Sequence, residues 1–227
     1  MAINLTKGQK IDLRKSNGDQ LTNFCVGVNW GAIETTKPGF LGFGTKKVVE
    51  DVDLDLSCIM TDASGALVDW IYSPDYNAFL KQNNFPLGKL NSNDYALKHS
   101  GDDRQGDVGG DDGLDNEIIS VDLTKVNEKI TQIFFFINIY LNPGQNIDFA
   151  KIPFAKIRMY EGTPTKVSSV HSNFDIVTDN SFAGKGALIL AKLYRKNEEW
   201  KFDAIGDASS DNMFLQTIER ITASYSK

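Results

Sequence analysis

The sequence predicts an all-β protein, mainly an antiparallel β-sandwich, with a C-terminal helix and long loops. Three observations support this class. Short apolar or alternating segments recur along the chain, turn-forming residues separate them, and a clear helical periodicity occurs only near the C-terminus. Strands at this spacing with few helices are typical of a sandwich. The chain has 227 residues, a length that suits a single domain covering residues 1–227.

The predicted strands of the first third follow a period of two. Residues 24–30 alternate large apolar side chains with smaller ones, and residues 51–57 place Asp51, Asp53, Asp55 and Ser57 on one face of a strand. The predicted strands here are 11–13, 24–30, 51–57 and 66–72. A turn at 62–65 joins the last two into a hairpin.

Two long segments in this part carry no clear periodicity. Residues 31–50 are rich in Gly and Lys, and we interpret them as a loop. Residues 73–93 are polar and aromatic, and we interpret them as a surface excursion with one short helix. Tyr76, Phe79 and Phe85 are its expected anchors on the body of the protein.

The second half of the sequence continues the β pattern and ends in a helix. Residues 132–141 are apolar on both faces, which indicates a central strand buried between layers. Ser210 is the expected N-cap of a helix at about 210–225, with a stripe formed by Phe214, Ile218, Ile221 and Tyr225. The other predicted strands are 117–123, 154–160, 186–195 and 199–205, with a tight turn at 196–198.

Composition and charge restrict the classes of function. Lys and Arg number 24 against 30 Asp and Glu, and no basic face is apparent, so nucleic acid is not an expected partner. No apolar run approaches the roughly 18 residues of a membrane span, and the opening residues lack the apolar stretch of a secretory signal. We therefore expect a cytoplasmic protein. Cys25 and Cys58 lie in apolar strand patterns and are expected to be small buried side chains.

An acidic stretch, residues 101–117, carries the net charge of the chain. It holds seven acids, five glycines and one base, Arg104, so that seven minus one gives six negative charges, equal to the net charge of −6. Carboxylates about 4 Å apart repel by roughly 4 kcal/mol at an effective dielectric near 20. A calcium ion would neutralise them, since it takes about 6–8 oxygen ligands and tolerates irregular geometry. Glycines let backbone carbonyls turn inward. The alternative is a solvated acidic loop without a ligand.

Two further patterns bear on a metal site. No register of the acidic stretch fits the spacing of an EF-hand loop, so a site here would be of another type. Three Asp residues on one face of the strand at 51–57 are unfavourable because like charges repel and Asp is a poor strand former. A shared cation would explain them, and a solvated acidic face is the alternative. If the cation is shared, Asp53 and Asp55 lie beside the acidic stretch.

Several motifs resemble one known family in its own order along nearly the whole chain. They are residues 3–8, 26–30, 53–57, 99–103, 110–112 with 117–119, 193–202 and 204–206. On these motifs the chain resembles the TerD family of tellurium-resistance and general stress proteins. Its longer loops at 31–50 and 73–93 are similar to those of the longer variant branch.

The resemblance implies a calcium-binding β-sandwich of the bacterial cytoplasm, with one or two Ca²⁺ ions held by acidic loops near one edge. It also implies a stress-response binding or recognition module rather than an enzyme, with other stress-response proteins or a small ligand as partners. The implied metal-site residues are Asp53, Asp55, Asp102, Asp103, Asp107, Gly109, Asp111, Asp112 and Glu117. The sequence departs from the family pattern at Gly31, at Asp103 and in residues 113–116, which intervene before Glu117.

Two other functions stay open. A metal-dependent hydrolase could use the same carboxylates for acid–base work or to activate water. His99 is expected to be a structural hydrogen-bond donor rather than a base, and no convergent His, Lys or Tyr is expected at the acidic motifs. A nucleotide-binding protein could use Arg158, Arg195 and Trp200, although strand packing explains Trp200 more simply. The sequence contains no phosphate-binding loop, nucleophile elbow or Cys-x-x-Cys motif.

Overall fold

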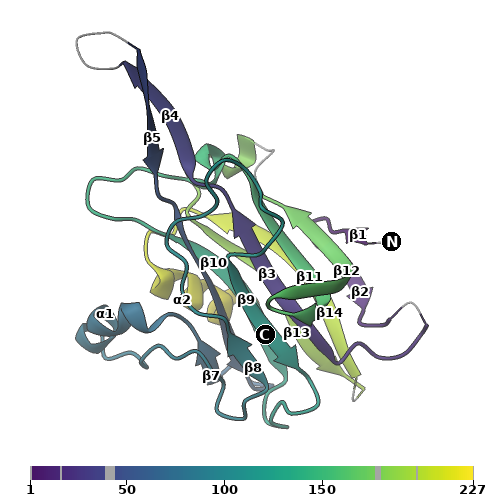
Figure 1. Ribbon diagram of the computed structural model, residues 1–227. Coiled ribbons are helices and arrows are strands. Elements are labelled where there is room, and N and C mark those ends of the chain that lie inside the picture. The colour runs from purple at the N-terminus through teal and green to yellow at the C-terminus, as the bar shows by residue number, and fades with distance from the viewer. Residues whose placement is uncertain (1, 16, 39–43, 177–179, 198, 227) are drawn as a thin grey trace.

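The computed structural model is a sandwich of two six-stranded β-sheets, with a separate two-stranded hairpin (Figure 1). It describes residues 2–15, 17–38, 44–176, 180–197 and 199–226. Within these residues no helix is long and apolar enough to cross a membrane. The predicted class, a mainly antiparallel β-sandwich with a C-terminal helix, is confirmed.

Sheet one contains the strand that carries the clearest alternation in the sequence. Its order is β1 (Ile3–Asn4), β12 (Lys166–Asp175), β11 (Ala155–Thr163), β3 (Asn23–Trp30), β9 (Glu117–Asp122) and β8 (Leu97–His99). All neighbours pair antiparallel except β1 with β12.

Sheet two is antiparallel throughout. Its order is β2 (Lys10–Asp12), β14 (Glu199–Ser209), β13 (Ala187–Lys196), β10 (Gln132–Tyr140), β6 (Asp53–Thr61) and β7 (Leu67–Ile71). β7 pairs only with residues 58–61 of β6, so among the described residues the edge of β6 between residues 53 and 57 has no neighbouring strand on that side.

The main core lies between the two sheets and follows from the period of two. Val26 and Val28 of β3 face Leu54 and Leu56 of β6 in one cluster of buried side chains. The central strand β10 is buried on both faces, as predicted: Phe135 enters this core, whereas its neighbours enter a second cluster on the outer face of sheet two. Both cysteines are buried and free, which confirms their expected role.

Helices cover the outer face of sheet two. The terminal helix α2 (Phe214–Ser224) packs there together with the excursion that carries η2 (Pro74–Tyr76) and α1 (Asn77–Gln82). The expected anchors Tyr76, Phe79 and Phe85 all pack against this second cluster. Two further short turns of 3₁₀-helix are η3 (Phe149–Lys151) and η4 (Asn180–Phe182).

The prediction that Ser210 caps the terminal helix is wrong. The helix begins at Phe214, with Met213 at the N-cap position. The side-chain oxygen of Gln216 accepts hydrogen bonds from the backbone N–H groups of Asn212 and Met213, at 3.0 and 3.2 Å. A glutamine inside the first turn thus satisfies the donors that the sequence pattern had assigned to a serine cap.

The interpretation of residues 31–50 as a loop is also wrong. They contain an antiparallel hairpin of β4 (Ile33–Pro38) and β5 (Thr45–Glu50). β-Branched residues such as Thr35, Thr36 and Val48 favour extended backbone, and the lysines and glycines around them hid this signal. The half-exposed, Ser-rich strand β12 and the short strands β1 and β8 were not predicted, because none shows a clean alternation. In the predicted turn at 196–198, Asn197 has φ of 52° and Glu198 lies outside the described residues.

A buried polar pair joins the central strand to the terminal helix. Asn138 of β10 donates from Nδ2 to Oγ1 of Thr217 at 2.9 Å, and both residues are buried. Thr217→Val keeps the side-chain shape but leaves the Asn138 donor without a partner, so we expect the free energy of unfolding to fall by about 1–3 kcal/mol in urea titrations. Thr222→Val, the same change at a half-buried position of α2 whose hydroxyl bonds only to carbonyls of its own helix, should stay within about 0.5 kcal/mol of the parent. Equal losses in the two variants would contradict a specific role for the pair.

Candidate metal centre

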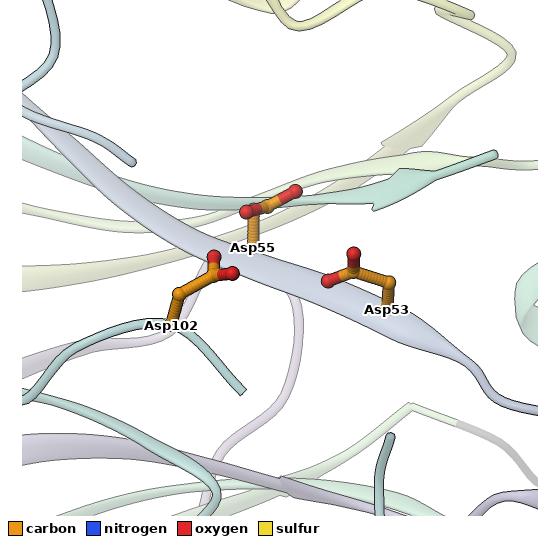
Figure 2. A group of neighbouring side chains, drawn as sticks. All are labelled: Asp53, Asp55 and Asp102. Atoms are coloured by element: carbon orange, nitrogen blue, oxygen red, sulfur yellow. The ribbon is translucent and has the colours of Figure 1, made fainter. Parts of the chain in front are cut away.

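Three carboxylates from distant parts of the sequence meet at one end of the sandwich. Figure 2 shows Asp53 and Asp55 on β6, with Asp102 approaching from the loop that follows β8. Each offers one oxygen, and these oxygens lie within 4.8 Å of one another. We call Asp53, Asp55 and Asp102 the acidic triad. The expectation that Asp53 and Asp55 lie beside the acidic stretch is confirmed.

The unpaired edge of β6 allows this approach. Because β7 stops at the level of Cys58, the backbone groups of Leu56 need other partners. The carboxylate of Glu117 accepts the Leu56 N–H at 2.6 Å, and Nε2 of His99 donates to the Leu56 carbonyl at 3.0 Å. Two side chains of sheet one therefore replace a neighbouring strand, and they bring the acidic stretch against β6.

Glu117 and His99 are both buried and have structural roles here. The second carboxylate oxygen of Glu117 accepts the backbone N–H of Asp103 at 3.1 Å, and burial raises its pKa well above the usual value. Nδ1 of His99 accepts the N–H of Gly101 at 3.0 Å, so its proton is on Nε2. Burial lowers the pKa of His99 to about 4, which keeps the ring neutral at pH 7. The prediction that His99 is a structural donor is confirmed.

The acidic triad carries more negative charge than its surroundings neutralise. Burial, followed by repulsion from Asp102 and Glu117, raises the pKa of Asp53 to about 7. Burial also raises the pKa of Asp55 well above its usual range, with repulsion from Glu117 and Asp53 adding to the effect. Oδ1 of Asp53 is buried and has no hydrogen-bond partner among the described residues. An oxygen in this state fits a cation, which would satisfy it and hold the carboxylates ionised.

A cleft of about 490 Å³ opens beside the acidic triad. Tyr76, from the excursion at 73–93, donates a hydrogen bond from its hydroxyl to Asp55. The ring of Tyr140 packs edge-on against the ring of Tyr76, with the two ring centroids 5.8 Å apart. Arg104 binds Asp102 through Nε at 2.9 Å and also pairs with Asp75. The expectation that no Tyr converges on the acidic motifs is therefore wrong. The sequence predicts Tyr76 only as an apolar anchor, because nothing local in the sequence links it to Asp55.

The other predicted ligands lie outside the triad. Asp103 and Asp107 share the side-chain amide of Asn116, which donates to each at 3.3 Å. Asp107 also accepts the backbone N–H of Asp112 at 3.0 Å, and the Gly109 N–H donates to Glu34 of the hairpin.

Asp111 also lies outside the acidic triad. Its carboxylate forms an ion pair with Lys156 at 2.6 Å and accepts a hydrogen bond from the side-chain amide of Asn29 at 3.1 Å. The structure thus brings together only part of the predicted set, and Asn116 and Asn29 are partners that the acidic pattern did not reveal.

The four residues that interrupt the family pattern fasten the acidic stretch to sheet one. Asp115 is almost fully buried and pairs with Nε of Arg158 at 2.8 Å. Asn116 accepts the backbone N–H of Trp30 at 2.9 Å. Arg158, on sheet one, is therefore engaged in the ion pair with Asp115. The guanidinium of Arg195 lies on sheet two, 4.6 Å from the centre of the Trp200 ring. The suggested nucleotide site of Arg158 with Arg195 and Trp200 does not assemble.

Asp115 packs directly on Gly27, where a Cβ atom would overlap its carboxylate. Gly27→Ala would push the carboxylate away from Arg158, leaving a buried ion pair broken, which typically costs about 3–5 kcal/mol. We expect a clear fall in melting temperature. Gly186→Ala is the control, because a Cβ there meets its nearest atom, the carbonyl of Asp211, at 3.6 Å. If both variants melt like the parent, Asp115 does not fasten the loop.

Comparisons with known proteins agree with this architecture. A family model described as TerD domain matches residues 1–220. Stress response protein SCP2 of Bacillus subtilis is 33% identical over 97% of this chain and 99% of its own length. Tellurium resistance protein TerD of Serratia marcescens is 28% identical over 91% of this chain and 90% of its own length. A solved homologue of telluride resistance protein from Streptomyces coelicolor shares the fold, with a TM-score of 0.56 at 15% identity over 91% of this chain and 98% of that one. The chain belongs to the TerD family of tellurium-resistance and general stress proteins.

Proposed function

We propose that this chain is a calcium-binding stress-response protein of the tellurium-resistance type, acting as a binding module and not as an enzyme. The observation that carries the proposal is the acidic triad with its buried, unpartnered Asp53 oxygen. Membership of a family whose relatives are named for stress response and tellurium resistance supports the biological context.

The donor set favours a hard cation. Asp53, Asp55 and Asp102 offer only oxygens, which suit calcium and magnesium, whereas zinc and copper sites in proteins commonly include nitrogen or sulfur. Calcium accepts irregular arrangements completed by water and backbone carbonyls, whereas magnesium demands near-octahedral geometry. The triad would hold the ion. If two ions are bound, the carboxylates of Asp103 and Asp107, which now accept from the side-chain amide of Asn116, would be the place for the second.

The groups around the triad favour binding over catalysis. His99 is neutral and has both ring nitrogens engaged by backbone groups, so it is not placed to move a proton. Tyr76 is committed to Asp55. A bound ion would hold the carboxylates ionised, whereas a general acid needs a raised pKa near the working pH. The module would act through the surface that the ion organises.

One observation favours a second candidate, a metal-dependent hydrolase. The cleft beside the triad holds Arg104 close to where an ion would lie, and such a site could polarise an anionic ester. A screen of phosphoesters and glycosides with calcium, magnesium and manganese tests it. Metal-dependent turnover abolished by Asp102→Asn would replace the binding-module proposal.

Calcium should stabilise the chelator-treated protein. At free calcium 100 times the dissociation constant, the gain in unfolding free energy is about 2.7 kcal/mol. We expect a measurable rise in melting temperature with calcium and a smaller rise with magnesium at the same concentration. A melting curve that millimolar calcium leaves unchanged would contradict the proposal.

Neutralising a single member of the triad should weaken calcium binding but should not destabilise the calcium-free protein. Asp53→Asn and Asp55→Asn should each weaken calcium binding by roughly tenfold or more, since even residues that only support metal ligands contribute about 10–100-fold. Without calcium, each variant should melt at or above the parent temperature, because a buried repulsive charge is removed. Calorimetric titration and melting curves in chelator measure both effects.

Asp175→Asn provides the control for those variants, because Asp175 is an exposed acid at the end of β12. It should change neither calcium affinity nor stability. Parent-like calcium binding by both Asp53→Asn and Asp55→Asn would show that this strand face is merely solvated.

A further inference from the structure

The hairpin of β4 and β5 stands apart from the sandwich. It forms a sheet of its own, and Figure 1 shows it projecting from the body. In its outer half Thr35, Thr36, Lys37 and Thr45–Lys47 are all exposed. A two-stranded hairpin is at best marginally stable in water, so a projecting one needs either an anchor at its base or a partner along its length. We call residues 33–38 and 45–50 the arm.

The base of the arm is anchored to the acidic stretch. Glu34 accepts the N–H of Gly109, and the Ala32 N–H donates to the Asp107 carbonyl at 2.9 Å. Ile33 packs against the main core. These contacts fix the direction of the arm but reach no further than its first residues.

The outer part of the arm concentrates positive charge in an unfavourable arrangement. Lys37 and Lys46 are direct cross-strand partners, so their side chains lie on the same face. Like charges placed directly opposite are destabilising. Among the described residues no carboxylate forms an ion pair with either lysine, whereas Lys47 pairs with Glu34. An acidic partner from outside would remove the repulsion.

The cleft beside the acidic triad is complementary to these lysines. It is lined by Asp51 and Asp75, both exposed, and by the three carboxylates of the triad, and Arg104 is the one base among the described residues of the lining. A divalent ion and Arg104 supply three positive charges against five carboxylates, so the cleft stays negative when an ion is bound. Tyr140, 45% exposed, offers a ring face for an aliphatic stem and its ammonium group.

The arm cannot fill the cleft of its own molecule. Asp51 follows directly on β5, and Lys46 lies five residues earlier on an extended strand, which places its backbone about 16 Å away. The hairpin extends away from the body of the sandwich (Figure 1), and Lys46 lies in its outer half. Two copies with their arms side by side and antiparallel would each place their lysines near the Asp51 of the other.

From this complementarity we propose that the arm of one molecule docks in the acidic cleft of a second copy, giving a reciprocal two-fold dimer. Lys37 and Lys46 contact Asp51 and Asp75 of the second copy. Each contact is used twice, as in other two-fold interfaces. The surface involved is small, so the dimer is weak, with a dissociation constant above about 1 μM. The dimer does not require calcium and stands independently of the proposed function.

Charge exchange between the two surfaces tests the dimer. In chelator and low salt, sedimentation velocity of the parent should show concentration-dependent dimers, which disappear in 1 M salt because the screening length falls to about 3 Å. The arm variant Lys37→Glu/Lys46→Glu and the cleft variant Asp51→Lys/Asp75→Asn should each dimerise at least about tenfold more weakly. Mixed together, they should form a 1:1 complex, because the lysine arm of the cleft variant meets the native cleft of the arm variant.

Lys129→Gln/Lys166→Gln is the control, because it removes two exposed lysines elsewhere and should dimerise like the parent. Melting curves verify that all variants are folded. A parent that stays monomeric at every concentration overturns the proposal, and so does a mixture of arm and cleft variants that shows no complex. A monomeric parent whose arm binds vesicles containing phosphatidylglycerol, with binding lost in the arm variant, would assign the lysines to anionic lipid instead. Running the experiment in chelator separates its result from that of the calcium titrations.

Discussion

The acidic end of this protein depends on how Leu56 satisfies its two backbone groups. β7 does not reach this residue, so Glu117 accepts its N–H and His99 donates to its carbonyl. Buried backbone groups rarely go without partners, and here buried side chains of the opposite sheet supply them. The same Glu117 also accepts from Asp103. One carboxylate thus joins the two sheets and sets the position of the acidic stretch, and with it the approach of Asp102 to β6.

The sequence predicts an element well where burial imposes a simple pattern of apolar residues. It predicts an element poorly where the strand is exposed or where the interacting residue is not the one that the pattern suggests. The alternation at 24–30 and the two-sided apolar run at 132–141 predicted β3 and β10 because core strands on a pleated sheet leave few choices. The hairpin at 33–50 and strand β12 escaped because their faces are largely exposed, and exposed strands need not alternate. Helix α2 was predicted from its apolar stripe, yet its start was misplaced because a glutamine does the capping.

The candidate site shows the same division. Asp53, Asp55 and Asp102 were predicted from charge, since repulsion between crowded acids is visible in the sequence. Their neighbours Tyr76 and Arg104 depend on how two long excursions fold back over β6, which no local pattern encodes. The residues at 113–116 read as an interruption of a motif, but in space Asp115 and Asn116 tie the acidic stretch to β11 and β3. Long-range hydrogen bonds of this kind become visible only in three dimensions.

The short reach of β7 has one more consequence, for the behaviour of the protein in a crowded solution. A strand edge with free N–H and carbonyl groups is a template to which another extended chain can add, the first step toward β-aggregates. Residues 53–57 of β6 would be such a template, but the acidic stretch lies along them and its charge discourages an incoming strand. The acidic stretch therefore also protects this strand edge from pairing with another chain. Shortening it would leave a core strand of the sandwich open to self-templated assembly.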